Sequence, residues 1–298
     1  MEIQIRQTVA HLLRRTLSPT TFEFARIWWW RFSFPARRVF SRFVKRKPEV
    51  RGFGSGDGAS HFVQQLQNVN VLAPTEMCRV MTKYGSDKAK RHNFTTVYSV
   101  LFKAFRNQPA RIFELGLGTN NPGLPSSMGI YGRPGASLRG WQELFPNALV
   151  YGADIDRSIL FQDDRIKTFY CDQLDPASIR ELWSQPDLQN GLDVIIEDGL
   201  HTFEANVSFL EGSLEHLRPG GVYVVEDIDQ SMVDRWCDQL ETIYSKRYPT
   251  FLFAVVILPS SLKLPDNNLL VVYRGTESSV SRSLRASPAA AIQINERQ

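Results

Sequence analysis

Short apolar runs alternate with longer amphipathic stretches over residues 94–273. The runs are rich in Val, Ile and Phe, as buried strands are, whereas the stretches place apolar residues at spacings of three and four, as helices do. We predict seven strands, at residues 111–115, 149–153, 166–171, 193–197, 222–226, 251–257 and 269–273. Strands that alternate with helices predict an α/β fold with a doubly wound, seven-stranded, mostly parallel sheet.

Three helices are the most clearly patterned. One apolar stripe covers residues 94–106, and Asp175-Pro176 has the sequence of an N-cap followed by proline at the first helical position. The clearest helix begins near Phe203 and is predicted to end at the turn 218–221, where proline stops it and two glycines allow the chain to turn. Its stripe consists of Phe203, Val207, Leu210, Leu214 and Leu217.

Composition divides the chain into four parts. With 298 residues and 43% hydrophobic content it can bury a sizeable core. We predict an N-terminal arm over residues 1–50, a Gly/Ser linker over 51–60, the folded domain over 61–275 and a disordered tail over 276–298.

The N-terminal arm differs from the rest of the chain in charge. Residues 1–51 carry twelve Lys or Arg and three Asp or Glu, a net +9, which leaves −5 for the remainder of the +4 chain. Basic residues interleaved with aromatic ones, as around Trp28-Trp29-Trp30, suit the headgroup region of a membrane. An amphipathic helix packed on the body or on a second subunit explains the arm equally well, and RNA binding is the weaker reading because no RNA-binding motif accompanies the charge.

The sequence predicts a cytoplasmic protein whose contact with a membrane, if any, is peripheral at the inner face of the plasma membrane. No run of about 20 apolar residues is present, and the N-terminus lacks the apolar region and cleavage site of a secretory signal. Cys78, Cys171 and Cys237 are far apart and odd in number, which is typical of free thiols in a reducing compartment.

Polar groups follow three consecutive predicted strands. The first strand ends in an E-x-G-x-G turn with Glu114 and Gly116, and glycines there let backbone approach a ligand closely. Asp154 after the second strand is placed to accept ribose hydroxyls, and Gln173 after the third can reach an adenine amino group. Together these residues predict a nucleoside site. Because Glu114 suits a cationic group and the third glycine of the dinucleotide motif is missing, S-adenosylmethionine is favoured over NAD.

Three carboxylates follow the fourth and fifth strands. Asp198 ends one of them, and Glu226 and Asp227 end the other. If these strands are neighbours, the carboxylates meet at one sheet edge, which is costly unless a cation or a proton neutralises them. Oxygen ligands alone suit Mg²⁺.

His201 follows Asp198 by three residues. Alone, it is best explained as a helix-capping or solvent-facing residue, and Asp198-Gly199 as a turn. Beside three carboxylates and a metal ion, a neutral imidazole can act as the general base that takes the proton of an attacking hydroxyl.

Residues 83–274 resemble the class I S-adenosylmethionine-dependent methyltransferases, and specifically the metal-dependent sugar O-methyltransferases typified by the mycinamicin enzymes. The motifs that carry the resemblance are KYGSDK, HNFTTVY, FELGLG, YGADID, CDQLD, IIEDGLH, LRPGGVYVVEDI and DNNLLVV. The resemblance implies a Rossmann-like methyltransferase fold, with Asp198, Glu226 and Asp227 as Mg²⁺ ligands and His201 as base. It also implies that the cofactor is surrounded by Glu114, Gly116, Asp154, Gln173 and Asp198.

We therefore predict a bacterial O-methyltransferase that uses S-adenosylmethionine and Mg²⁺ on a sugar hydroxyl, in a surface or lipid-linked glycan. We expect no nucleic acid partner and allow for a homo-oligomer. The alternatives are a methyltransferase of phenols or other small metabolites, an NAD-dependent oxidoreductase, and a non-catalytic adaptor whose arm does the binding.

Overall fold

The computed structural model describes residues 47–54, 57–260 and 262–276. The predicted arm, apart from its last four residues, and the predicted tail, apart from residue 276, lie outside the described residues. No helix among the described residues has the length and apolar character needed to cross a bilayer.

The described chain is built on one nine-stranded sheet with the order β1-β8-β9-β7-β6-β2-β3-β5-β4. Its strands are β1 (Glu49–Phe53), β2 (Arg111–Leu115), β3 (Leu149–Asp154), β4 (Gln162–Asp163), β5 (Ile166–Tyr170), β6 (Leu192–Glu197), β7 (Leu217–Val225), β8 (Phe251–Ile257) and β9 (Asn268–Arg274). All seven predicted strands are present, and β1 and β4 are added at the two edges.

The centre of the sheet is parallel and its edges are antiparallel. Strands β7, β6, β2, β3 and β5 pair in parallel, while β9 runs antiparallel between β7 and β8. The strand order reverses beside β2, since the chain passes from β2 to β3 on one side and reaches β6 on the other. In open α/β sheets, ligands bind at such a switch point, outside the carboxyl ends of the strands.

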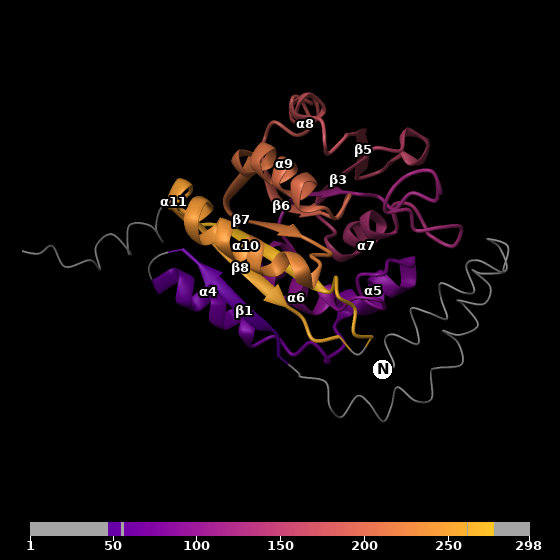
Figure 1. The fold of residues 1–298 in the computed structure, drawn as a ribbon. Coiled ribbons are helices and arrows are strands. Elements are labelled where there is room, and N and C mark those ends of the chain that lie inside the picture. The colour runs from indigo at the N-terminus through magenta and orange to yellow at the C-terminus, as the bar shows by residue number, and fades with distance from the viewer. Residues whose placement is uncertain (1–46, 55–56, 261, 277–298) are drawn as a thin grey trace, which may run out of the picture. The chain divides into compact units, whose positions relative to one another are not determined.

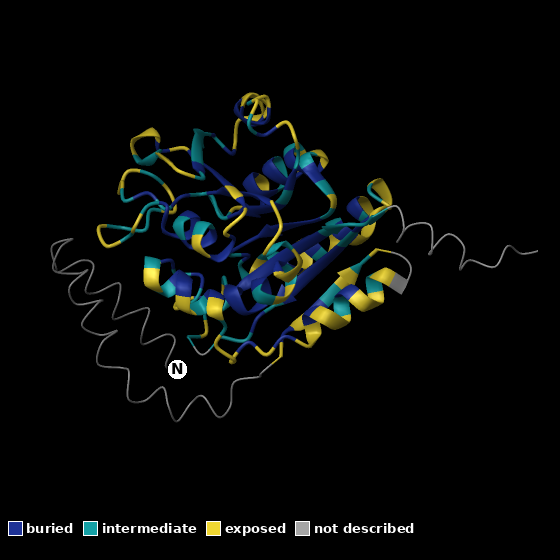
Figure 2. Ribbon diagram, turned by 180° about the vertical axis from the view of Figure 1, so that it is seen from behind, coloured by how far each residue is buried: buried dark blue, intermediate teal, exposed yellow. Residues whose placement is uncertain are grey.

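Helices cover both faces of the sheet, which confirms the doubly wound prediction (Figure 1). One core packs α4 (Asp57–Gln67), α5 (Glu76–Tyr84), α6 (Phe94–Leu101) and α7 (Ala136–Leu144) against one face. The other core packs α8 (Pro176–Trp183), α9 (Phe203–Ser213) and α10 (Val233–Gln239) against the opposite face. The central strands between them, β2, β3, β6, β7, β8 and β9, are mostly buried (Figure 2). The remaining helical turns are short: α11 (Ser245–Arg247), a π-helical turn at Leu240–Tyr244, and 3-10 turns at Lys103–Phe105, Arg157–Ile159, Leu214–His216 and Gln230–Met232.

Local sequence explains where several helices begin. Asp175 accepts a hydrogen bond from the backbone N–H of Ala177 and Pro176 follows it, as the sequence predicted. Thr202 caps α9 in the same way by accepting from Ala205. The predicted helix 94–106 is shorter than expected, because α6 ends at Leu101 and continues only as a 3-10 turn over Lys103–Phe105.

The predicted linker 51–60 is wrong. Residues 49–53 form β1, which pairs antiparallel with β8, and α4 begins at Asp57. Gly52, which suggested a flexible segment, instead makes room for the helix: a Cβ at this position would lie 2.2 Å from a methyl carbon of Val63. The folded body therefore begins before residue 61.

The predicted end of the clearest helix also differs. α9 ends at Ser213 and is followed by a 3-10 turn, so Leu217 is not helical but begins β7, opposite Leu192. The register of β6 and β7 shifts between Leu192 and Val194, so the segment from Arg218 to Gly221 lies within an irregular strand. The apolar spacing of Leu217 matches a helix only because its side chain is buried in the same core.

Candidate active site

A cavity of about 400 Å³ opens at the carboxyl ends of the central parallel strands. Its walls come from the segments that follow β2, β3, β5, β6 and β7, with contributions from the loops before α6 and β9. Of the predicted site residues, it is lined by Gly116, Asp154, Gln173, Asp198, His201 and Asp227. The predicted convergence on one edge of the sheet is thus present for these six.

Gly116 is required by the protein backbone itself. It has a φ of +89°, and a Cβ there would lie 1.9 Å from the carbonyl oxygen of Asp198. The turn after β2 is therefore pressed directly against the end of β6, which joins the glycine turn to the carboxylate cluster.

Glu114 lies one layer below the cavity. Its side chain is fully buried and accepts hydrogen bonds from the Ser137 hydroxyl at 2.5 Å and the Trp141 indole at 2.5 Å. It borders a smaller hollow of about 30 Å³ beside the main cavity. Burial raises the pKa of Glu114, and the Lys88 ammonium, 3.4 Å away, opposes that shift.

Asp154 and Gln173 are both held by backbone groups. Asp154 accepts from the N–H of Leu117 at 2.7 Å and of Asp156 at 2.8 Å, so it fastens the glycine turn. Gln173 accepts from the N–H of Leu200 at 2.9 Å and donates to Glu197 at 2.7 Å. Because the backbone N–H can only donate, the amide of Gln173 is oriented with its oxygen toward Leu200.

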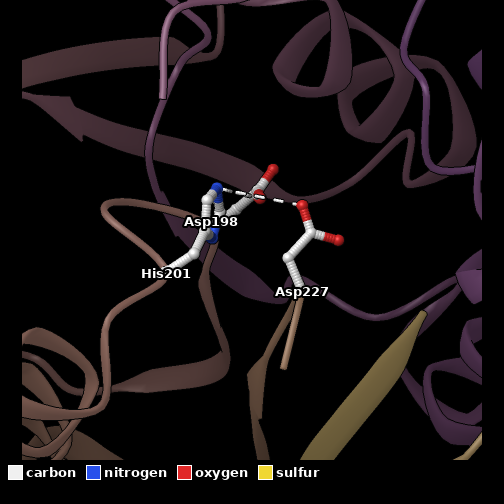
Figure 3. Close-up of side chains that lie close together, drawn as sticks. All are labelled: Asp198, His201 and Asp227. Carbon is white, nitrogen blue, oxygen red and sulfur yellow. Dashed lines mark ion pairs between the residues drawn. The ribbon is translucent and has the colours of Figure 1, made fainter. Parts of the chain in front are cut away.

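Asp198, His201 and Asp227 form the core of the site (Figure 3). His201 Nε2 lies 3.9 Å from Asp198 Oδ1 and 3.8 Å from Asp227 Oδ2. One ligand atom from each of the three residues lies within 4.8 Å of the others. Asp198 follows β6 and Asp227 follows β7, two strands that pair in parallel, so sheet register fixes the spacing of the two carboxylates.

The backbone of this cluster adopts a rarely populated conformation. His201 has a φ of +59° and Asp227 a φ of +53°, in the left-handed region that L-residues avoid. Only two other non-glycine residues in the described part of the chain do so, and one of them, Ser126, also lines the cavity. Strain of this kind gathers at sites where function fixes side-chain direction.

Burial sets the charge state of the cluster. It lowers the pKa of His201, so the imidazole is neutral at pH 7. Burial, with the Asp198 charge beside it, raises the pKa of Asp227 well above its usual range. The neutral imidazole adds no positive charge beside the two neighbouring carboxylates. A cation close to them would therefore stabilise their charged forms.

The third predicted ligand, Glu226, lies outside this group of three. It is 1% exposed and accepts from Lys88 Nζ at 2.7 Å and from the Tyr98 hydroxyl at 2.6 Å. Lys88 also donates to Asp198 at 2.6 Å. Burial alone would lower the pKa of Lys88, but Asp198, Glu114 and Glu226 raise it well above its usual range, so the ammonium stays charged.

The donor set fits a hard divalent cation. Asp227 Oδ1 and His201 Nδ1 are buried and have no hydrogen-bond partner. Buried polar atoms without partners are rare and call for an ion or water. Asp198 and Asp227 supply the oxygen donors that Mg²⁺ prefers, and a carboxylate oxygen already bonded to one donor keeps a second lone pair, so Glu226 can also take part.

Sequence reasoning missed the residues that complete the site. Lys88 and Tyr98 belong to motifs noted for resemblance, but no role was assigned to either. The cavity is also lined by Asp87, Arg91 and Asp266, and Arg91 Nη2 lies 3.6 Å from Asp266 Oδ2. The sequence did predict that three converging carboxylates need a cation or a proton nearby. It did not indicate that a lysine would supply part of the positive charge.

The chain is similar in sequence to known sugar O-methyltransferases. No protein-family model matches the chain. The chain is 36% identical over 149 residues to an 8-demethyl-8-alpha-L-rhamnosyl tetracenomycin-C 2'-O-methyltransferase of Streptomyces olivaceus, covering 50% of the chain and 36% of the relative. It is 33% identical over 202 residues to an L-olivosyl-oleandolide 3-O-methyltransferase of Streptomyces antibioticus, covering 66% of the chain and 49% of the relative. The chain thus spans between a third and a half of these two relatives' length.

A solved structure matches the fold. The MycE methyltransferase from the mycinamycin pathway, in complex with Mg, SAH and mycinamycin VI, superposes with a TM-score of 0.50 at 25% sequence identity, covering 73% of this chain and 61% of that one. The large, mostly parallel α/β sheet and the resemblance noted in the sequence agree with these similarities. The described chain has the fold of a class I S-adenosylmethionine-dependent methyltransferase and resembles the mycinamicin-type sugar O-methyltransferases.

Proposed function

We propose that the chain transfers a methyl group from S-adenosylmethionine to a sugar hydroxyl with the help of Mg²⁺. One observation carries the proposal: Asp198, His201 and Asp227 converge within 4.8 Å at the ends of two adjacent parallel strands. The same cavity extends past Gly116, Asp154 and Gln173, where the nucleoside of the cofactor would lie. The sugar O-methyltransferases that resemble the chain support the choice of reaction.

In the proposed reaction the cofactor supplies an electrophilic methyl carbon. The acceptor oxygen forms the new C–O bond as the C–S bond breaks, and the hydroxyl proton passes to the neutral imidazole of His201. The products are the methyl ether and S-adenosylhomocysteine. His201 suits this role because burial keeps it unprotonated and its Nε2 faces both carboxylates.

Asp198 and Asp227 would hold the metal ion, with Glu226 as a third ligand in contact with Lys88. A bound Mg²⁺ would stabilise negative charge and lower the pKa of an acceptor hydroxyl beside it. Asp198 also shapes the cofactor end, because its carbonyl oxygen rests against Gly116. His201 lies close enough to Asp198 and Asp227 to be a metal ligand itself. An experiment is therefore needed to distinguish a general base from a metal ligand at this position.

The first test replaces His201 by Ala. We expect methyl transfer to fall by about 10²- to 10⁴-fold, the usual contribution of a general base. Titration with Mn²⁺, followed by electron paramagnetic resonance, separates the two roles: a base leaves the metal affinity nearly unchanged, whereas a ligand lowers it. Lys263→Ala is the matched control, because Lys263 shares the left-handed backbone, with a φ of +52°, and does not line the cavity.

Removing the metal is the second arm of that test. EDTA should abolish methyl transfer, and added Mg²⁺ should restore it. If activity survives both chelation and His201→Ala, the proposed mechanism is wrong.

The acceptor is proposed to be a sugar within a lipid-linked or surface glycan, and a phenol or another small metabolite is the alternative. Incubation with S-adenosylmethionine and a panel of glycosides, purified glycans and catechols, read by mass spectrometry, decides between them. A gain of one methyl on a glycan supports the proposal, and a gain on catechols alone contradicts it.

Peripheral membrane contact through the basic arm is part of the same proposal and rests on sequence alone, since residues 1–46 lie outside the described chain. Cosedimentation with vesicles containing anionic lipid tests it. Binding by the full chain that weakens at high salt, and that is lost when residues 1–46 are removed, supports membrane contact. Binding to neutral and anionic vesicles alike contradicts it.

A further inference from the structure

Lys88 is the most deeply buried basic side chain among the described residues near the site. It lies in the segment between α5 and α6 and is 1% exposed. Its ammonium group donates to Asp198 at 2.6 Å and Glu226 at 2.7 Å and lies 3.4 Å from Glu114. One cation thus faces three carboxylates that come from three different strand ends.

These contacts join the two ends of the site. Glu114 borders the hollow beside the glycine turn, while Asp198 belongs to the group that fits a metal ion. Glu226 is held on its other oxygen by Tyr98 at 2.6 Å, so both of its oxygens are fixed before any ion arrives. Asp198 is held by Lys88 through Oδ2, while Oδ1 faces His201.

Charge explains why such a contact is needed. Three carboxylates at one sheet edge repel one another, and a divalent ion could only partly relieve this, because Glu114 lies below the cavity and outside the group of three. A buried carboxylate left without a partner is strongly destabilising. A lysine built into the chain supplies positive charge permanently and in a fixed direction.

We propose that Lys88 is a positioning residue, a built-in cation that assembles the carboxylate cluster so that the site exists before a divalent ion binds. The wild-type fold is then largely independent of metal. The ion finds Asp198, which Lys88 holds directly, and Asp227, which follows the Lys88-bound Glu226 along the chain, already in place. This inference rests on the metal site of the proposed function. Its test, however, reads stability and metal binding, and neither requires methyl transfer.

The experiment compares Lys88→Met with the wild type by thermal unfolding in EDTA and in Mg²⁺. Met keeps most of the length of the side chain and removes its charge. In EDTA we expect the variant to melt roughly 10 °C lower, as for other buried ion pairs that lose one partner. Mg²⁺ should restore at least half of that shift, while it changes the melting temperature of the wild type by only a few degrees.

Metal affinity gives a second, independent readout. Without the ammonium, the cluster is more negative, so Mn²⁺ should bind Lys88→Met about tenfold more tightly than the wild type. The matched control is Lys83→Met, because Lys83 pairs with Glu143 at the surface, with 58% of its side chain exposed. That variant should bind Mn²⁺ like the wild type and gain no extra stability from Mg²⁺.

A charge-balanced double variant covers the case in which the single variant fails to fold in EDTA. Lys88→Met combined with Glu226→Gln removes one charge of each sign, so it should melt above the single variant in EDTA. The proposal is overturned if Lys88→Met loses the same stability with and without Mg²⁺, if its Mn²⁺ affinity is unchanged or weaker, or if Mg²⁺ fails to recover an unfolded single variant. Loss of methyl transfer in all variants, with these stability results intact, would count against the reaction and not against the role of Lys88.

Discussion

A comparison of Gly116 with Gly129 distinguishes two reasons why a position requires glycine: the backbone conformation and the space available for a Cβ. Both have a positive φ, with values of +89° and +69°. A Cβ at Gly116 would meet the Asp198 carbonyl oxygen at 1.9 Å, whereas nothing lies within 4 Å of a Cβ at Gly129. The first position is thus constrained by packing as well as by backbone conformation, and the second by conformation alone.

We therefore expect Gly116→Ala to lower the free energy of unfolding by roughly 3 kcal/mol or more, since it adds backbone overlap to the left-handed penalty. Gly129→Ala should cost only about 1 kcal/mol. Urea denaturation of both variants measures the difference. Equal losses would mean that the turn after β2 moves freely away from Asp198.

His216 supplies a pH dependence that lies away from the site. Burial lowers its pKa, and its ring stacks on Trp183 with centroids 4.7 Å apart. Because the folded state binds the proton less readily than the unfolded state, His216 favours folding above the unfolded pKa of about 6.5, and this contribution is lost as the pH falls below it. His216→Phe keeps an aromatic ring and removes the proton site.

We expect the free energy of unfolding of the wild type, relative to His216→Phe, to decrease between pH 7.5 and pH 5. Urea denaturation of both proteins at each pH measures that difference and cancels contributions from other groups. A constant difference would show that His216 titrates alike in the folded and unfolded chain.

The sequence predicted the meeting of Asp198, His201 and Asp227 because strand order at a parallel edge leaves little freedom. The sequence could not predict which cationic side chain contacts Glu226. Lys88 is 138 residues away along the chain and reaches Glu226 only through the packing of the segment before α6. Nothing in the residues around Lys88 distinguishes it from Lys83, which forms an exposed ion pair with Glu143.

At the scale of elements, apolar runs identified the seven inner strands because all of these except β5 are mostly buried on both faces. β1 escaped prediction because it lies at an edge, where only Val50 among its five residues is fully buried and Gly52 lies in the middle. β4, with two residues, is too short to leave a pattern. The hydrophobic pattern of the sequence therefore predicts the central strands of this sheet but not its two edge strands.

β1 protects the strand beside it. β8 has the sequence FLFAVVI, with mostly buried residues, and would be an exposed edge without β1. A long apolar edge strand pairs readily with other chains. We expect a chain that starts at residue 54 to unfold at a lower temperature than one that starts at residue 47, and to aggregate. Light scattering during thermal unfolding compares the two; equal behaviour would make β1 dispensable.

At the scale of the whole molecule, one residue belongs to both halves of the cavity. The backbone of Asp198 rests on Gly116 at the proposed nucleoside end, while its carboxylate faces His201 in the proposed metal site. In the proposed site, an ion that fixes this carboxylate would also fix the wall against which the cofactor would lie. Because binding linkage is reciprocal, each ligand must then strengthen the binding of the other by the same factor.

We expect S-adenosylhomocysteine to bind about five- to tenfold more tightly in the presence of saturating Mn²⁺ than in EDTA, within the usual range of coupling between two sites. Isothermal titration calorimetry measures both affinities, and the converse titration of Mn²⁺ with and without S-adenosylhomocysteine must give the same factor. Asp227→Asn is the matched control. It removes one carboxylate of the proposed metal site and leaves the contact between Asp198 and Gly116 unchanged. In that variant the affinity in EDTA should equal that of the wild type and the gain from Mn²⁺ should disappear. A gain that persists in Asp227→Asn would place the coupling elsewhere than in the shared residue.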